Sequence, residues 1–260
     1  MACRRSFHNQ ATTVAGNTIA PVEVDRLFFG VDSKVPADDL LQNNLTEFEW
    51  VRRNKVYPNF WARNITGEGA ITKGEIEFLH GMGCKIAPIF LTDDAKKTEE
   101  QGLIDAKKVD EIAVKLGIPK GTAIFIEIGD SEEATTNYLK GFAEGMGYGG
   151  YIAGFKANTD AAYSFDREFS RGMRLNPDLF KPCLVWAVAP TLSEYDRITT
   201  SHLIRPDNWA PFAPSGITRK DIAIWQYGKD CHPIHDDAGK LTVFNLDLVR
   251  NESVIIERMF

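Results

Sequence analysis

Residues 85–130 have the sequence KIAPIFLTDDAKKTEEQGLIDAKKVDEIAVKLGIPKGTAIFIEIGD, and this stretch indicates the fold class. Its first part, KIAPIFL (85–91), is an apolar run of strand length, and its last part, AIFIEIGD (123–130), is another. Between them, apolar residues recur at the helical spacing i, i+3, i+4, i+7: Val109, Ile112, Ala113 and Leu116. A strand, a helix and a second strand predict a right-handed crossover between parallel strands.

The same alternation continues on both sides of this stretch. Further strands are predicted in the apolar runs 27–33, 59–64, 150–155, 183–190, 222–228 and 241–249. Further helices are predicted after the capping box formed by Thr72 and Glu75, after a cap at Ser131, and over 160–174. We therefore expect an α/β protein with a single (β/α)8-type (TIM) barrel over 25–260. Its last third is expected to be irregular, because the alternation breaks down after about residue 190.

An open doubly wound sheet is the competing architecture. In nucleotide-binding folds of that kind, a glycine-rich phosphate loop directly follows the first strand. Here the first strand ends in Val31, Asp32 and Ser33, and the glycine cluster at 145–150 follows a predicted helix, where capping explains it. The barrel is therefore favoured. Residues 1–24 are polar and aperiodic, and are predicted to form a flexible lead-in.

The composition excludes several classes of protein. The chain has 260 residues, of which 43% are hydrophobic and 25% are charged, and its net charge is −6. No apolar run reaches the roughly 18–20 residues of a membrane helix. An acidic surplus without basic stretches argues against nucleic acid or an anionic membrane as the main partner. The N-terminus as it stands lacks the apolar segment of a secretory signal, and neither localisation nor oligomeric state follows from the sequence.

Carboxylates occur where the predicted strands end, which is where a parallel barrel forms its active site. The candidates for catalysis are Asp32, Glu127, Asp130 and Asp247. The candidates for substrate binding are Arg63, Asp93, Trp186, Trp225, Gln226 and Tyr227. Acids ringed by aromatic side chains suit a carbohydrate, because flat rings stack on sugar C–H faces and two carboxyl groups can divide acid and base or nucleophile work. Glu127 interrupts an apolar strand, where burial favours the protonated form that a general acid requires.

Several of these residues also have structural explanations. The pair 130–131 fits a helix cap, and the pair 93–94 fits a solvated turn. Trp186 and Trp225 fit the barrel core as well as a sugar platform. Arg63, at the end of a predicted strand, is expected to point into the barrel mouth and to orient a carboxylate or an acidic group of a glycan.

Metal and cofactor sites are not expected. The segment 231–237 contains Cys231, His232 and His235, which are residue types that bind metals. A zinc site needs a second ligand pair at a defined spacing, and the sequence has none. The segment is therefore predicted to be a polar surface loop. The four cysteines lie far apart and are expected to be free thiols.

The order and spacing of several short motifs are similar to those of a known family. GVDS (30–33), IFIEIGD (124–130), VWAVAP (185–190), IWQYG (224–228) and FNLDLV (244–249) resemble the glycoside hydrolase family 25 lysozymes. The segments PNFWARNITG and TKGEIEFLHGMGCKIAPIF, together with IFIEIGD, look more closely like a bacterial glycoside-hydrolase-like domain of unknown function related to those lysozymes. The resemblance spans residues 26–250 and implies a TIM-type barrel that acts on a glycan, usually peptidoglycan.

The resemblance also implies roles for particular residues. The family's first-strand Asp corresponds to Asp32, and the Asp of its closing motif corresponds to Asp247. Its fourth-strand motif is Asp-x-Glu, whereas this chain has Glu127, Ile128 and Gly129, so the second acid is replaced by glycine. Two hypotheses follow. The leading hypothesis is that the chain is a hydrolase of cell-wall polysaccharide with Glu127 as general acid, and the alternative is that it is a non-catalytic glycan-binding, effector or scaffold barrel.

Overall fold

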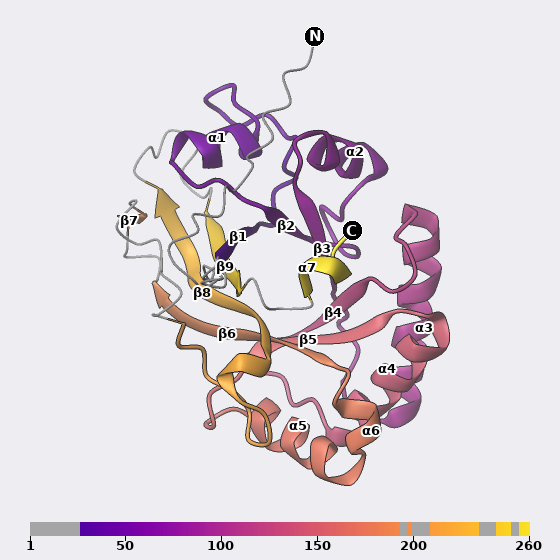
Figure 1. The fold of residues 1–260 in the computed structure, drawn as a ribbon. Helices are drawn as coiled ribbons and strands as arrows, with labels where there is room; N and C mark the ends of the chain where they lie inside the picture. Colours follow the sequence, from indigo (N-terminus) through magenta and orange to yellow (C-terminus); the bar gives the residue numbers. More distant parts are fainter. Residues whose placement is uncertain (1–26, 193–196, 199–208, 234–242, 251–254) are drawn as a thin grey trace, which may run out of the picture.

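The strand–helix–strand unit at 85–130 forms β3 (Lys85–Phe90), α3 (Glu99–Leu116) and β4 (Ala123–Ile128). The side chain of Thr98 caps α3 by accepting a hydrogen bond from the backbone N–H of Gln101, and Gly117 ends the helix in the left-handed conformation. β3 and β4 are parallel neighbours, as a crossover requires. The fold is that of a computed structural model (Figure 1), in which residues 27–192, 197–198, 209–233, 243–250 and 255–260 are described. The lead-in predicted at 1–24 lies outside the described residues.

The remaining elements extend the same alternation. The other strands are β1 (Leu27–Asp32), β2 (Phe60–Asn64), β5 (Ile152–Asn158), β6 (Leu184–Leu192), β7 (Arg197–Ile198), β8 (Ile222–Pro233) and β9 (Phe244–Arg250). The other helices are α1 (Glu47–Arg53), α2 (Lys73–Gly81), α4 (Thr136–Gly149), α5 (Ser164–Leu175), α6 (Pro177–Phe180) and α7 (Ile255–Arg258). Between β6 and β8 the described residues form β7 and a short 3₁₀ helix (Arg219–Asp221), and no α-helix.

The strands close into a barrel, as predicted. β1 to β6 lie side by side in chain order, and β8 pairs with β6 on one side and with β9 on the other. β9 then pairs with β1, so the sheet closes through β1–β6, β8 and β9. This closure excludes the open doubly wound sheet. Strand β9 departs from the parallel arrangement of the other barrel strands, because it is antiparallel to both of its neighbours, β8 and β1.

The helix boundaries were predicted with mixed success. α2 begins after Thr72, whose side chain accepts a hydrogen bond from the backbone N–H of Glu75, as expected. The cap predicted at Ser131 is wrong, because the side chain of Thr135 caps α4 instead. α1 was not predicted, although Thr46 and Glu49 form a capping box at its start.

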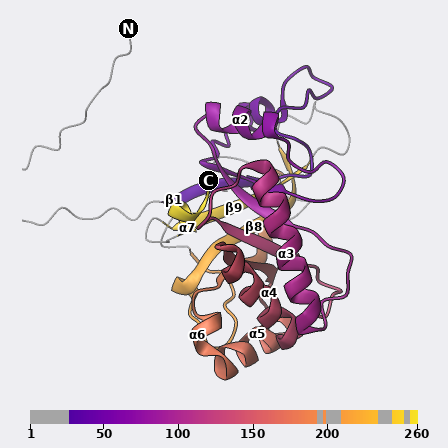
Figure 2. The same ribbon diagram turned by 90° about the vertical axis from the view of Figure 1, so that its right-hand side faces the viewer.

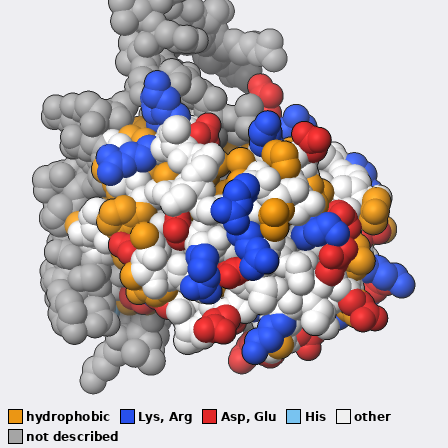
Figure 3. Space-filling view, turned by 90° about the horizontal axis from the view of Figure 1, so that it is seen from below, with side chains coloured by type: hydrophobic (Ala, Val, Ile, Leu, Met, Phe, Trp, Pro, Cys, Tyr) orange, Lys and Arg blue, Asp and Glu red, His pale blue; other side chains and the backbone are white. Residues whose placement is uncertain are grey.

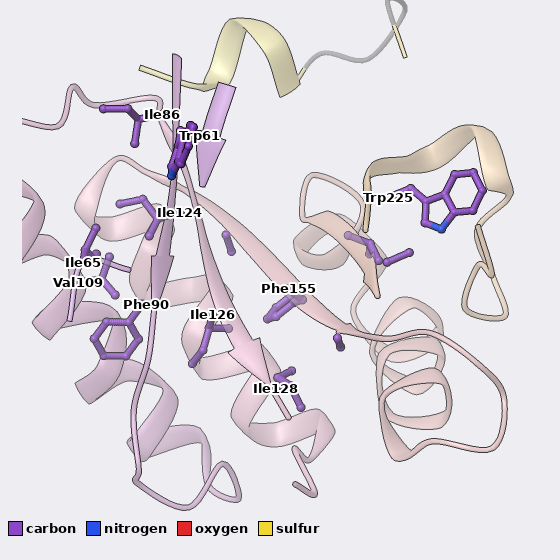
Figure 4. Packing of buried hydrophobic residues seen from close by; sticks show 14 of the residues in the cluster. Trp61, Ile65, Ile86, Phe90, Val109, Ile124, Ile126, Ile128, Phe155 and Trp225 are labelled. Atoms are coloured by element: carbon purple, nitrogen blue, oxygen red, sulfur yellow. The ribbon is translucent and has the colours of Figure 1, made fainter. Parts of the chain in front are cut away.

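Two apolar clusters fill the inside and the outside of the barrel wall. The inner cluster of apolar side chains includes Phe60, Phe125, Trp186 and Val249, from four different strands. The outer one packs the strands against the helices and includes Ile124 and Ile126 of β4, seen together with Val109 of α3 in Figure 4. Successive residues of a strand thus alternate between the barrel interior and the helix layer.

The C-terminal helix closes the barrel at the amino ends of the strands. Ile255 and Met259 of this segment belong to the inner apolar cluster. The backbone N–H of Ile86, at the start of β3, donates to the carbonyl oxygen of Phe260 at 2.7 Å. The end at which the strands start is therefore packed with apolar side chains, and the opposite end, where the parallel strands finish, is the one available for a site.

Helices α3 and α4 pack unusually closely on the outside of the barrel, where they lie side by side (Figure 2). A Cβ atom on Gly102 would overlap the backbone of α4, and one on Gly141 would overlap the carbonyl oxygen of Glu99. Glycine is therefore required at both positions by close backbone approach.

The surface on the side of α5 and α6 carries charges of both signs, mixed with scattered apolar side chains (Figure 3). Within the described residues, none of the helices combines the length and the apolar composition needed to cross a membrane.

Candidate functional site

Four charged side chains from four strands face the inside of the barrel near its carboxyl end. Asp32 is the last residue of β1, and Glu127 of β4 is in register with Lys156 of the neighbouring β5. Asp247 of β9 lies opposite Gly30, one pleat deeper in the barrel than Asp32. We call Asp32, Glu127, Lys156 and Asp247 the inner charged cluster. It contains three of the four residues predicted to be catalytic, together with a lysine that the sequence analysis missed.

Lys156 joins two of these carboxylates. Its Nζ donates to the carboxylate of Asp32 and, at 3.2 Å, to Glu127 Oε2, and it lies 5.0 Å from the centre of the Trp186 ring. Burial by itself lowers the pKa of Lys156, but the carboxylates of Asp32, Glu127 and Asp247 outweigh it and hold the pKa above its ordinary value. Lys156 is therefore a buried ammonium ion that is paired on two sides.

Asp247 lies deepest in the cluster and is completely buried. Its Oδ1 accepts a hydrogen bond from Trp186 Nε1 at 2.9 Å, and within the described part of the chain its Oδ2 has no partner. Burial raises the pKa of Asp247 well above its ordinary range, and the charge of Asp32 adds to this, while Lys156 and Trp186 oppose it. Burial thus favours the protonated form of Asp247 over its carboxylate.

The exposure of the four side chains differs in a way that matters for binding. The side chain of Glu127 is 39% exposed, whereas those of Asp32 and Lys156 are 10% and 4% exposed. Asn245 of β9, which was also missed, donates from Nδ2 to Asp32 Oδ2 at 3.2 Å. Glu127 is therefore the most exposed of these three side chains, and Lys156 anchors its carboxylate from the barrel interior.

Arg63 requires a correction, because its guanidinium faces away from the barrel mouth. Side chains alternate in direction along β2, and because Ala62 points into the barrel, Arg63 beside it points outward. The guanidinium donates to both carboxylate oxygens of Glu75 on α2, at 2.6 and 3.3 Å, and to the backbone oxygens of Ser33 and Gly69. It is completely buried, so it cannot orient a ligand.

Glu47 of α1 completes this second set of buried charges. Its carboxylate accepts a hydrogen bond from the hydroxyl of Ser33 at 2.6 Å. Burial raises the pKa of Glu47 well above its ordinary range, against the opposing effects of Ser33 and Arg63. We call Ser33, Glu47, Arg63 and Glu75 the outer charged cluster.

The predicted aromatic lining of the groove is also corrected by strand alternation. Trp225 and Tyr227 of β8 point outward into the apolar layer behind the barrel wall, and both are buried. Trp186 points inward, but it is buried beneath Lys156 and supports the inner charged cluster from below. Gln226 points inward too, is buried, and lies opposite Asp247 in the β8–β9 register. None of these rings offers an open face to a sugar.

The sequence profile of one protein family, described as Rv2525c-like, glycoside hydrolase-like domain, matches residues 56–247. The chain belongs to this glycoside hydrolase-like family. The match includes β2 to β8 and most of β9 up to Asp247, and so it contains all of the inner charged cluster except Asp32. The resemblance to this family inferred from the motifs is confirmed.

Two solved structures show the same fold as this glycoside hydrolase-like barrel. An uncharacterized B. stearothermophilus protein is 21% identical, with a TM-score of 0.72 over 90% of this chain and 100% of that one. The catalytic domain of endolysin ply40 from bacteriophage P40 of Listeria monocytogenes is 13% identical, with a TM-score of 0.51 over 87% and 95% of the two chains. No curated protein matches the chain. At these identities the likeness is one of fold.

Two further predicted site residues lie on exposed loops at the carboxyl end of this glycoside hydrolase-like barrel. Asp130 is exposed and lies 3.7 Å from the ammonium of Lys229. Asp93 is exposed and, with Glu133, lies at an open cavity of about 340 Å³ between the loops that follow β3 and β4. Neither residue contacts the inner charged cluster through a described hydrogen bond or ion pair.

Gly129 occupies the place where the related lysozymes are expected to have their second acid. Its N–H donates to the carboxylate of Glu132 at 3.1 Å. A Cβ atom there would meet only the Glu132 side chain, at 3.5 Å, which is ordinary van der Waals contact. Contacts at the Cβ position therefore do not by themselves require glycine at this place.

The cysteine and histidine segment is only partly described. Cys231 is buried and His232 is half-buried, while His235 lies outside the described residues. Among the residues that the structure describes, no three His, Cys, Asp or Glu side chains are grouped to hold a metal ion.

Proposed function

We propose that this barrel binds a bacterial cell-wall glycan at its carboxyl end, over Glu127, without hydrolysing it. The observation that carries this proposal is the ammonium of Lys156, which is hydrogen-bonded to both Asp32 and Glu127. Support for a glycan as the ligand comes from the family, which is described as glycoside hydrolase-like, and from the fold shared with an endolysin catalytic domain.

Lys156 opposes lysozyme-type chemistry for an electrostatic reason. Glycoside hydrolysis passes through a transition state in which the sugar carries positive charge, and carboxylates stabilise that charge. In this barrel a single buried ammonium is paired with both Asp32 and Glu127 and offsets part of their negative charge, and burial disfavours the charged form of Asp247 by raising its pKa. The second acid is also missing, since position 129 is glycine. The site therefore suits hydrogen bonding to sugar hydroxyls better than stabilisation of a cation.

Hydrolysis with Glu127 as general acid is the second candidate function. The observation in its favour is that Glu127 points inward and is 39% exposed, so a glycosidic oxygen can reach it. In this alternative Asp32 and Asp247 orient substrate or water, and Asp130 lies nearby after the end of the same strand.

One experiment separates the two candidates. The full chain is titrated with soluble peptidoglycan fragments in a calorimeter and is incubated with purified cell walls, in which new reducing ends are measured. We expect binding without release of reducing ends, and we expect Glu127→Gln to bind at least about tenfold more weakly, since a charge-assisted hydrogen bond contributes about 1.5–3 kcal/mol. Glu77→Gln, the same substitution at an exposed position of α2, is the matched control. Release of reducing ends by the wild type that Glu127→Gln abolishes would establish the hydrolase instead.

A further inference from the structure

The burial of Trp186, Trp225 and Tyr227 leaves open which aromatic ring would contact a sugar. Among the described residues, the large aromatic side chains that are exposed are Tyr57, Tyr148 and Phe212, at 56%, 83% and 49%. A ring that contributes to a glycan site must lie at the carboxyl end of the strands, where the inner charged cluster opens. The three can therefore be separated by their place in the fold.

Two of the exposed aromatic residues lie at the wrong end of the barrel. Tyr57 precedes the first residue of β2, and Tyr148 lies in the last turn of α4, just before β5 begins. Both positions are at the amino ends of the strands, because each leads into a strand that runs toward the site. Neither ring can contact a ligand bound over Glu127.

Phe212 lies at the carboxyl end. Its backbone oxygen accepts a hydrogen bond from Thr159 Oγ1 at 2.9 Å, and Thr159 directly follows the last residue of β5. β5 is the strand that carries Lys156. Thr159 lies three residue steps beyond Lys156 along an extended chain, which is roughly 10 Å. Phe212 is thus held at the rim beside the strand that contributes the central residue of the site.

The chain on either side of Phe212 is anchored to the rest of the barrel by hydrogen bonds and ring packing. Before Phe212, Trp209 donates from Nε1 to the backbone oxygen of Arg219 at 2.9 Å, and its ring packs against Trp225 with centres 5.7 Å apart. After it, the backbone N–H of Ser215 donates to Asp166 on α5 at 2.7 Å. An exposed apolar ring on an anchored backbone loses little conformational entropy when it binds, which favours its use as a contact surface.

We propose that Phe212 forms an outer sugar subsite at the rim of the barrel, which takes the apolar C–H face of a pyranose ring. This inference rests on the proposed function, since the sugar belongs to the glycan chain that Glu127 binds. Because of the distance along β5, Phe212 contacts a different sugar unit from the one over Glu127. The phenyl ring has no hydrogen-bonding group, so it contributes packing that is indifferent to the hydroxyl pattern of that sugar.

The dependence of affinity on glycan length tests this subsite. The full chain and Phe212→Ala are titrated in a calorimeter with a disaccharide and a hexasaccharide from peptidoglycan. We expect the wild type to bind the hexasaccharide more tightly than the disaccharide. Phe212→Ala should lose about tenfold in affinity for the hexasaccharide and keep the affinity for the disaccharide, since only the longer chain reaches the rim. Phe212→Trp should preserve the length dependence.

Tyr148→Ala is the matched control, because it removes a more exposed aromatic ring from the opposite end of the barrel. It should bind both oligosaccharides as the wild type does. If Phe212→Ala keeps the full preference for the longer glycan, the subsite is overturned while the proposed function stands. If the wild type binds neither oligosaccharide, the proposed function fails and the subsite fails with it.

Discussion

The inner and outer charged clusters are built from similar parts on opposite sides of the barrel wall. Each contains carboxyl groups around a single buried cation, which is Lys156 inside and Arg63 outside. Burial raises the pKa of Asp247 in the inner cluster and of both Glu47 and Glu75 in the outer cluster. The difference is that the outer cluster is closed, with both partners of its ion pair buried, whereas the inner cluster exposes Glu127.

This difference fits a structural role for the outer cluster and the binding role that we propose for the inner one. In the outer cluster the guanidinium of Arg63 forms hydrogen bonds to the residue after β1, to the loop after β2 and to helix α2. These bonds tie the three segments to one another. The inner cluster makes fewer bonds to backbone and leaves one carboxylate able to accept hydrogen bonds from a solute. A buried charge cluster that ends in an exposed member is a place where a ligand can complete the hydrogen bonding.

The largest expected effect is on stability, from removing the cation of the outer cluster. Arg63→Met leaves Glu75 buried without its partner and frees two backbone oxygens. Breaking a buried pair from one side costs about 3–5 kcal/mol. We expect the free energy of unfolding, measured by urea denaturation, to fall by that amount, and the protein to be partly unfolded at room temperature if its total stability is ordinary.

Lys156→Met makes the matched change in the inner cluster. We expect a smaller loss, because the exposed Glu127 carboxylate is solvated by water once the ammonium is gone, and only Asp32 is left poorly compensated. If Lys156→Met destabilised the protein as much as Arg63→Met does, the inner cluster would be as structural as the outer one and the distinction between them would be lost.

The second prediction uses the buried carboxyl that each cluster holds. The unfolded chain releases these protons near pH 4, whereas folded Asp247 and Glu47 keep theirs because burial raises the pKa of each. Between the ordinary and the raised pKa the folded state binds more protons than the unfolded state, so stability falls as the pH rises through this window. The slope is about 1.4 kcal/mol per pH unit for each group.

Asp247→Asn and Glu47→Gln each replace one of these titratable carboxyl groups with an amide that does not titrate. Relative to the wild type, each variant should become more stable as the pH rises from 5 to 7, as measured by urea denaturation at each pH. Asp94→Asn is the control, since Asp94 is exposed and paired with Lys108. If the difference in free energy of unfolding between the variant and the wild type stayed constant from pH 5 to 7, the carboxyl group would be ionised in the folded protein.

Strand alternation explains how much of these clusters could be predicted from the sequence. The strands, most helices and the barrel follow from apolar runs and caps, and Asp32, Glu127 and Asp247 were identified because charges are rare in buried strands. The direction of a side chain was harder to predict. A strand that is covered on both faces is apolar at every position, so its sequence does not show which residues point inward. Arg63, Trp225 and Tyr227 were therefore assigned to the wrong side of the wall.

Lys156 was missed although its signal has the same form as that of Glu127. It interrupts the run GYIAGFKAN (150–158) in the way that Glu127 interrupts AIFIEI (123–128), but the predicted strand ends at Phe155, one residue before Lys156 and three residues before the end of β5. Phe212 had no such signal. Its place at the rim depends on the hydrogen bond from Thr159, more than 50 residues earlier in the chain, and local sequence patterns do not contain contacts of that range.

The smallest expected effect on stability comes from the exposed member of the inner cluster. Glu127→Gln keeps the shape of the side chain and a hydrogen-bond acceptor for Lys156, whose charge stays paired with Asp32. We expect the free energy of unfolding to change by no more than about 0.5 kcal/mol, as for an ordinary surface position. Glu75→Gln, the same substitution in the closed outer cluster, should destabilise the protein by several times as much, because it leaves the guanidinium of Arg63 buried without a counter-charge. Equal losses in the two variants would show that Glu127 serves the fold, whereas an unchanged stability together with the loss of glycan binding would assign its carboxylate to the ligand.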